Sequence, residues 1–251
     1  VKKLKADGVN IILITPSPYD DTAELDKENN KGANAELAKY GDFLARLAVE
    51  EDLPLVDFNG PMTELNQQLQ ADDPSFTLIG QDRVHPGWTG HFVMAYLFLK
   101  AQGAPSEVSS VTIDAKALSS QSDNAEITDL KAVKGGLSFT SKEGALPYPI
   151  DKSFAPALDY VSFMDDFNRE ELTVHGLASG KYKLLIDGEQ VGTFTQAELS
   201  TGINLALLTN TPQYKQAEQV LALVMKWRKK VFDLRQMALI EHGILRDLDH
   251  P

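Results

Sequence analysis

A carboxylate and an imidazole stand three residues apart in one short segment, Asp82-Arg-Val-His85-Pro-Gly87. An imidazole can take the proton of a serine hydroxyl and so act as the general base of an acyl-transfer reaction. A carboxylate bonded to the other ring nitrogen fixes the tautomer and stabilises the imidazolium that forms. Because a spacing of three lets both side chains reach one site from a single tight turn, Asp82 and His85 are the candidate catalytic residues.

The same spacing also has an ordinary structural explanation, in which Asp82 caps a local turn and His85 is a surface residue. The position of the pair in the chain favours the catalytic interpretation. It follows a predicted buried strand and precedes an apolar helix predicted for Trp88–Lys100. Open α/β sheets place their sites beyond the carboxyl ends of such strands.

Two apolar, β-branched runs predict parallel strands that are covered on both faces, Val9–Thr15 and Leu53–Phe58. Between them, residues 33–47 carry apolar side chains at four- and three-residue steps, which predicts an amphipathic helix. Strand, helix and strand in this order imply a crossover and a parallel pair, and therefore an α/β fold. Two such strands need neighbours to form a stable sheet, so we expect part of the sheet to come from outside this chain.

No activated nucleophile is evident in the sequence. It has no cysteine, which excludes a cysteine nucleophile, thiolate metal ligands and disulfides, and it has no Gly-x-Ser-x-Gly motif. Ser17 and Ser75 are the serines nearest to the predicted site by topology. Ser17 lies between two prolines, so a turn explains it better than catalysis. The chain therefore holds a base and its orienting group without their nucleophile.

The segment Asp82-Arg-Val-His85-Pro-Gly87 and the apolar helix after it resemble the last conserved block of the SGNH (GDSL-type) hydrolases. Ile12-Leu-Ile-Thr-Pro16 is similar to the family's penultimate strand, and the resemblance covers residues 1–102. It implies a three-layer α/β/α, flavodoxin-like fold that cleaves esters of lipids or acylated sugars, with His85 as base and Asp82 as its orienting residue. The family's Gly-Asp-Ser nucleophile motif, oxyanion-hole glycine and asparagine precede this region and are absent here.

The resemblance thus implies the C-terminal portion of a serine esterase, inactive when isolated, that acts on a small-molecule ester and is secreted or periplasmic. Composition excludes other classes. A net charge of −12 argues against nucleic acid as a partner, and no apolar run is long enough to span a bilayer. The five histidines lack zinc-site spacing and no glycine-rich phosphate loop follows a strand, so we expect no cofactor.

Two further regions follow the predicted hydrolase part, 1–103. Residues 104–208 predict a small antiparallel β module, with strand-like runs that include Tyr160–Phe163 and a hairpin at Asp187-Gly188. Residues 209–251 predict a long helix that begins at Thr211-Pro212. These regions leave an alternative open, in which the chain is a non-catalytic carbohydrate- or protein-binding module on an α/β scaffold.

Overall fold

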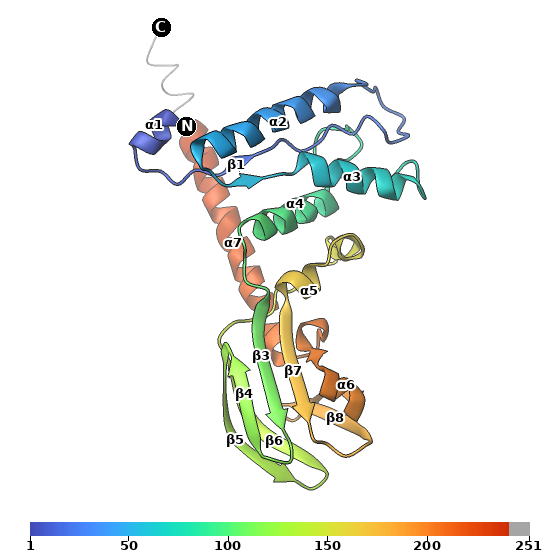
Figure 1. Ribbon diagram of the computed structural model, residues 1–251, viewed down its shortest axis with the longest axis vertical. Helices are drawn as coiled ribbons and strands as arrows, with labels where there is room; N and C mark the ends of the chain where they lie inside the picture. Colours follow the sequence, from blue (N-terminus) through green and yellow to red (C-terminus); the bar gives the residue numbers. More distant parts are fainter. Residues whose placement is uncertain (241–251) are drawn as a thin grey trace. The chain divides into compact units, whose positions relative to one another are not determined.

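The computed structural model describes residues 1–240 and has the α/β class predicted from the sequence (Figure 1). It forms two compact units. Unit 1 comprises residues 1–105 and 150–167, and unit 2 comprises 106–149 and the chain from 168 onward. Residues 150–167 belong to unit 1 although they lie within the predicted β-rich region 104–208. The end of the predicted helical region, residues 241–251, lies outside the described residues.

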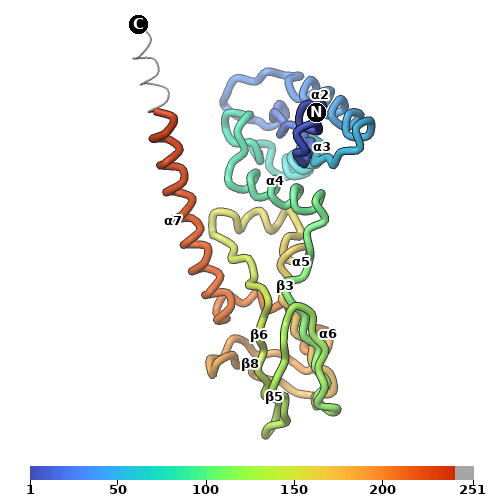
Figure 2. The backbone as a smooth tube through the Cα atoms, turned by 90° about the vertical axis from the view of Figure 1, so that its left-hand side faces the viewer, coloured from blue at the N-terminus to red at the C-terminus, as the bar shows by residue number. Residues whose placement is uncertain are grey.

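Unit 1 is built from helices around one short parallel strand pair. β1 pairs with β2 in the register Leu13↔Leu55 and Ile14↔Val56, so the predicted strand, helix and parallel strand are confirmed. Figure 2 shows α2, α3 and α4 grouped in this unit. Its elements are α1 (Lys2–Ala6), β1 (Leu13–Ile14), α2 (Ala33–Glu51), β2 (Leu55–Val56), α3 (Asn59–Gln70), α4 (Trp88–Ala101), a 3₁₀ turn η1 (Ala155–Asp159) and α5 (Phe163–Phe167).

The first apolar run was expected to be buried on both faces, and this expectation is wrong for the described chain. Within Val9–Thr15 only Leu13–Ile14 is paired as a strand, and Ile12 and Ile14 are 37% and 42% exposed. Parallel strands are stable when both faces are covered. β1 therefore shows an apolar face that residues 1–240 do not cover.

Helix α4 joins two apolar clusters of unit 1, which explains why it is apolar around most of its circumference. Val93 packs into a cluster with β2 and α3 residues such as Val56 and Met62. Phe92 and Tyr96 pack into a second cluster with Ala157 and Phe163. Helix α4 is consequently packed on two sides. The helix begins at Trp88, directly after the Asp82–Gly87 segment.

Unit 2 is a β module with two hairpins, one mixed sheet and a long helix. The four-stranded sheet has the order β10-β7-β3-β4, and β5-β6 and β8-β9 form separate pairs. Its elements are β3 (Glu107–Asp114), β4 (Ser119–Asp123), β5 (Ala125–Val133), β6 (Gly136–Glu143), β7 (Arg169–His175), β8 (Lys181–Ile186), β9 (Glu189–Thr195), α6 (Gln196–Thr201), β10 (Ile203–Asn204), η2 (Leu205–Leu207) and α7 (Pro212–Ile240).

Local signals in unit 2 are confirmed, and two non-local expectations need correction. The hairpin at Asp187-Gly188 forms with φ values of +53° and +84°, as a two-residue hairpin turn requires. The module is not purely antiparallel, because β3 and β7 pair in parallel (Figure 1). Tyr160–Phe163 is no strand; it joins η1 to α5 in unit 1.

The predicted start of the long helix is also confirmed. The backbone N–H of Tyr214 donates to Thr211 Oγ1 at 3.1 Å, which is the hydrogen bond of an N-terminal cap, and Pro212 is the first helical residue. None of the helices in residues 1–240 combines the length and the apolar character that crossing a bilayer requires.

Glu170 in β7 gives unit 2 a testable pH dependence. It is 1% exposed, and neither of its carboxylate oxygens has a hydrogen-bond partner among residues 1–240. Burial, and then the charge of Glu143, raise the pKa of Glu170 to about 7. Because the folded-state pKa of Glu170 lies above its unfolded value, the contribution of this residue to stability is fully present below pH 4.5 and is lost as the pH rises through 7.

We expect Glu170→Gln to remove most of this loss, which corresponds to about 3 kcal/mol between pH 4 and pH 8. Urea unfolding at a series of pH values measures it. Glu126→Gln, at an exposed position of β5, is the matched control and leaves the pH dependence in place. An unchanged pH profile in Glu170→Gln would contradict the assignment.

Candidate active site

Asp82 and His85 are brought together by one tight turn in the connection between α3 and α4. Asp82 Oδ1 accepts the backbone N–H of Val84 at 3.0 Å and of His85 at 2.9 Å. Asp82 Oδ2 lies 2.6 Å from His85 Nδ1. The carboxylate therefore caps the turn and orients the imidazole at the same time, so the structural and catalytic explanations of this spacing do not exclude each other.

The pair is electrostatically suited to accept a proton. Hydrogen bonds from the His85 backbone, the His85 ring and the Val84 backbone hold the pKa of the Asp82 carboxyl below its usual range. Asp82 is therefore ionised at neutral pH and can stabilise an imidazolium. The bond at Nδ1 leaves Nε2 as the nitrogen that can take a proton. The His85 side chain is 82% exposed, so this edge of the ring is open.

Two glycines shape the backbone around the turn. Gly80 has a φ of +61°, and a Cβ added to it would lie 2.8 Å from the carbonyl oxygen of His85. A Cβ at Gly90 would lie 2.1 Å from the carbonyl oxygen of Leu78. That carbonyl also accepts the N–H of Gly87 at 3.1 Å. The segment that contains Leu78 and the first helical turn of α4 thus approach each other too closely for any residue larger than glycine at position 90.

A buried amide holds the other end of this segment. Leu78 and Ile79 are fully buried in the first apolar cluster of unit 1, which anchors the segment by packing. Asn66 in α3 is buried as well, and its Oδ1 accepts the backbone N–H of Leu78 at 2.8 Å. No sequence pattern marks Gly80, Gly90 or Asn66 as part of this site. An isolated Gly or Asn has no spacing signal, because its role depends on a neighbour that the fold brings near.

The carboxyl ends of β1 and β2 are joined by a second polar network. Thr15 Oγ1 donates to Asp57 Oδ1 at 2.7 Å and accepts the backbone N–H groups of Phe58 and Asn59. Asn59 is the first residue of α3, and its side-chain amide donates to Asn34 Oδ1. These hydrogen bonds link the residue after β1 to those after β2 and satisfy the buried N–H groups of Phe58 and Asn59.

No serine completes the pair within the described chain. Among residues 1–240, no serine hydroxyl is hydrogen-bonded to His85, and Ser75 Oγ donates instead to Asp73 at 2.7 Å. Ser17 is half-buried beside the fully buried Pro18. The arrangement therefore has the geometry expected of a general base and its orienting carboxylate on an exposed edge, with no serine among residues 1–240 hydrogen-bonded to the imidazole.

Comparison with solved structures gives one extensive similarity. The chain is 37% identical to a gut microbial diltiazem-metabolizing enzyme, with a TM-score of 0.87, and the similarity covers 96% of this chain and 57% of that one. The chain thus spans a little over half the length of that enzyme. An acetyl xylan esterase gives a TM-score of 0.33 at 19% identity over 40% of this chain and 48% of its own, which is too weak for any argument.

No protein-family model matches the chain, and no curated protein matches it significantly. The similarity to the diltiazem-metabolizing enzyme, over 96% of this chain, supports the α/β fold. The resemblance to the SGNH hydrolases rests on the segments Asp82–Gly87 and Ile12–Pro16.

Gly80 and Gly87 form a matched pair for testing how the turn is held. We expect Gly80→Ala to lower the free energy of unfolding by about 1–3 kcal/mol, because it adds a Cβ at a left-handed φ against the His85 carbonyl. Gly87→Ala, whose Cβ would meet no atom within 4 Å, should change it by less than about 0.5 kcal/mol. Urea unfolding followed by circular dichroism measures both. Equal stabilities would show that the close approach at Gly80 does not constrain the turn.

Proposed function

We propose that this chain is part of a carboxylic ester hydrolase of the SGNH type, with a serine nucleophile supplied by a segment outside it. The observation that carries the proposal is the 2.6 Å contact between Asp82 Oδ2 and His85 Nδ1, made beside an exposed imidazole. This is the geometry in which a carboxylate fixes the tautomer of a general base.

In the proposed mechanism, the serine oxygen attacks the acyl carbonyl carbon while His85 Nε2 takes the hydroxyl proton. The imidazolium then gives this proton to the oxygen of the leaving alcohol, and an acyl-enzyme remains. Water attacks the acyl-enzyme by the same two proton transfers and releases the carboxylic acid and the free serine. Asp82 stays ionised throughout and pairs with the imidazolium at each step.

Two observations support a nucleophile-bearing segment elsewhere. The similar diltiazem-metabolizing enzyme is longer, and this chain covers 57% of it. In addition, the exposed apolar face of β1, with Ile12 and Ile14, requires a cover that residues 1–240 do not provide. A further α/β segment beside β1 would cover this face and could bring a serine toward His85.

The proposed substrate is a small acyl ester, a lipid ester or an acylated carbohydrate. The similarity to an enzyme named for acting on a small molecule supports a small-molecule substrate. The net charge of −12 disfavours polyanionic substrates such as nucleic acid. The acyl group and the alcohol are set by side chains around the nucleophile, and those lie outside this chain in the proposed arrangement.

Hydrolysis of a short-chain aryl ester by the longer protein, with the preceding segment included, tests the proposal. We expect His85→Ala to lower kcat by about 10⁴-fold or more, because the serine loses its base, and Asp82→Asn by about 10³–10⁴-fold. The chain of the printed sequence, assayed without the preceding segment, should hydrolyse the ester no faster than the uncatalysed rate.

Ser17→Ala is the matched control, because Ser17 is a serine near a strand end that has no part in the proposed mechanism. It should leave kcat unchanged in the longer protein. Turnover by the described chain that disappears in Ser17→Ala would contradict the assignment of the nucleophile to another segment.

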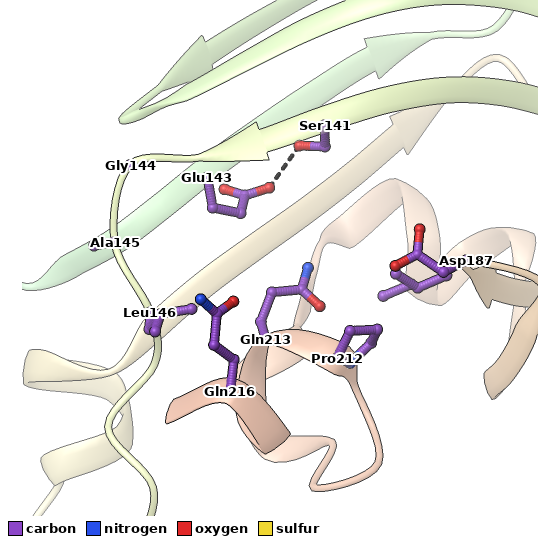
Figure 3. Close-up of a pocket in the computed structure, with 10 residues that line it drawn as sticks. Ser141, Glu143, Gly144, Ala145, Leu146, Asp187, Pro212, Gln213 and Gln216 are labelled. Atoms are coloured by element: carbon purple, nitrogen blue, oxygen red, sulfur yellow. Dashed lines mark hydrogen bonds between the residues drawn. The ribbon is translucent and has the colours of Figure 1, made fainter. Parts of the chain in front are cut away.

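A second candidate function is a carbohydrate- or protein-binding module, favoured by a polar hollow in unit 2. This hollow, of about 340 Å³, lies between the end of β6 and the start of α7 (Figure 3). Glu143 Oε2 and Gln213 Oε1 on its wall are buried acceptors that have no hydrogen-bond partner in the described part of the chain. Hydroxyl or amine donors of a ligand would satisfy them.

Calorimetric titration with neutral oligosaccharides separates the two functions. Binding that is lost in Gln213→Ala and kept in His85→Ala would belong to this module.

A further inference from the structure

Arg83 has an unusual position inside the Asp82–Gly87 turn. It is 2% exposed, whereas the side chains of Asp82, Val84 and His85 around it are exposed. Burial of a charged group is costly unless polar partners compensate it. Within residues 1–240 no carboxylate lies within ion-pair distance of this guanidinium. Its partners are four main-chain carbonyls: Nη1 donates to Asp20 (2.9 Å) and Ala23 (3.0 Å), and Nη2 donates to Leu25 (3.3 Å) and Lys27 (3.5 Å).

The main chain of Arg83 is held as firmly as its side chain. Its N–H donates to the carbonyl of Gly80 at 3.1 Å, and its carbonyl accepts the N–H of Asp20 at 3.1 Å. Its φ of +64° lies in the left-handed region, which is unfavourable for a residue with a Cβ. Such a conformation persists only where the surroundings enforce it. Here the hydrogen bonds of Arg83 provide that enforcement.

The 20–27 segment is itself arranged to present its carbonyls. The buried Asp20 carboxylate accepts the backbone N–H groups of Thr22 (3.1 Å) and Ala23 (3.0 Å) and the hydroxyl of Thr22 (2.9 Å). These bonds turn the N–H groups toward Asp20 and leave the carbonyls for Arg83. Burial acts to raise the pKa of Asp20, but hydrogen bonds from Thr77, Ala23 and Thr22 lower it overall.

We propose that Arg83 is a positioning residue, which fixes the Asp82–His85 pair by clamping the turn between them to the 20–27 segment. Asp82 and His85 are exposed, so packing does not hold their side chains. Their geometry is therefore set by the backbone of the turn, and Arg83 is its buried anchor. The role of this geometry in catalysis rests on the proposed function. The inference that Arg83 sets the geometry does not depend on that function.

The guanidinium is specifically suited to this task. Its planar fork carries several donors in fixed directions and reaches carbonyls of four residues at once, whereas an ammonium group is a single point with three donors. Lysine at this position should therefore keep the charge but lose part of the clamp. Glycine should accept the φ of +64° without strain while losing the clamp altogether. The two variants separate the backbone requirement from the side-chain requirement.

The first test uses the chain of the printed sequence and does not require enzymatic activity. In Arg83→Gly we expect the pKa of Asp82, followed by carboxyl NMR, to move back toward its ordinary value. The ¹⁵N shifts of the His85 ring should show that the proton is no longer fixed on Nδ1. Arg83→Lys should give an intermediate result. Val84→Ala, at the exposed neighbouring position, is the control and should match the parent chain in both measurements.

The second test uses the longer protein with an aryl ester. We expect Arg83→Gly to lower kcat by about 100-fold while KM changes less than about twofold, since the base is misplaced and no substrate contact is lost. Added guanidinium ion should restore part of kcat in Arg83→Gly and none in His85→Ala. A thermal unfolding curve for each variant shows that unit 1 is folded under the assay conditions.

The two tests have distinct failures. Arg83→Gly with unchanged Asp82 titration and His85 ring shifts would overturn the positioning role, because the backbone alone would then hold the pair. If the NMR signatures change but the longer protein carrying native Arg83 hydrolyses no ester, the proposed function fails and the positioning role of Arg83 stands.

Discussion

The hydrogen bond between Asp82 Oδ2 and His85 Nδ1 is the interaction on which the interpretation of this molecule depends. It is short, it joins two exposed side chains, and it lies in a turn with no regular secondary structure of its own. Exposed pairs are ordinarily weak, because solvent competes for both partners. This pair is maintained by its backbone, because Asp82 accepts hydrogen bonds from two backbone N–H groups of the turn in addition to its hydrogen bond with the imidazole.

The rest of unit 1 can be understood as support for that turn. The buried Leu78 and Ile79 hold the segment before it, and α4, packed between two apolar clusters, holds the segment after it. Gly90 permits the two to approach at the carbonyl of Leu78. An exposed polar pair on a rigid base is the arrangement expected of a site built on loops over a packed scaffold. The same unit carries the apolar face of β1 that residues 1–240 leave exposed.

The parts of this fold that depend on neighbouring residues could be predicted from the sequence. The helix from Trp88 follows its apolar pattern, the Asp187-Gly188 hairpin follows its turn chemistry, and the long helix begins at its Thr-Pro signal. The parts that depend on distant residues could not. Tyr160–Phe163 has a strand-like composition but joins two short helical elements in unit 1. The parallel pairing of β3 with β7 depends on a long connection that no local signal encodes. The pairing of Asp82 with His85 was predictable because its spacing is local. The burial of Arg83 was not, because its partners lie about sixty residues earlier in the chain.

The most direct test of the central claim, that His85 is the base for a serine outside this chain, is to read the gene upstream of Val1. The account predicts an open reading frame that continues upstream and encodes a Gly-Asp-Ser motif on the order of 100 residues earlier, as typical domain sizes suggest. A reading frame that starts at this boundary, or one that continues without such a serine, would contradict the account. The Asp82–His85 pair would then be a structural turn, and the polar hollow of unit 2 would be the better place to look for function.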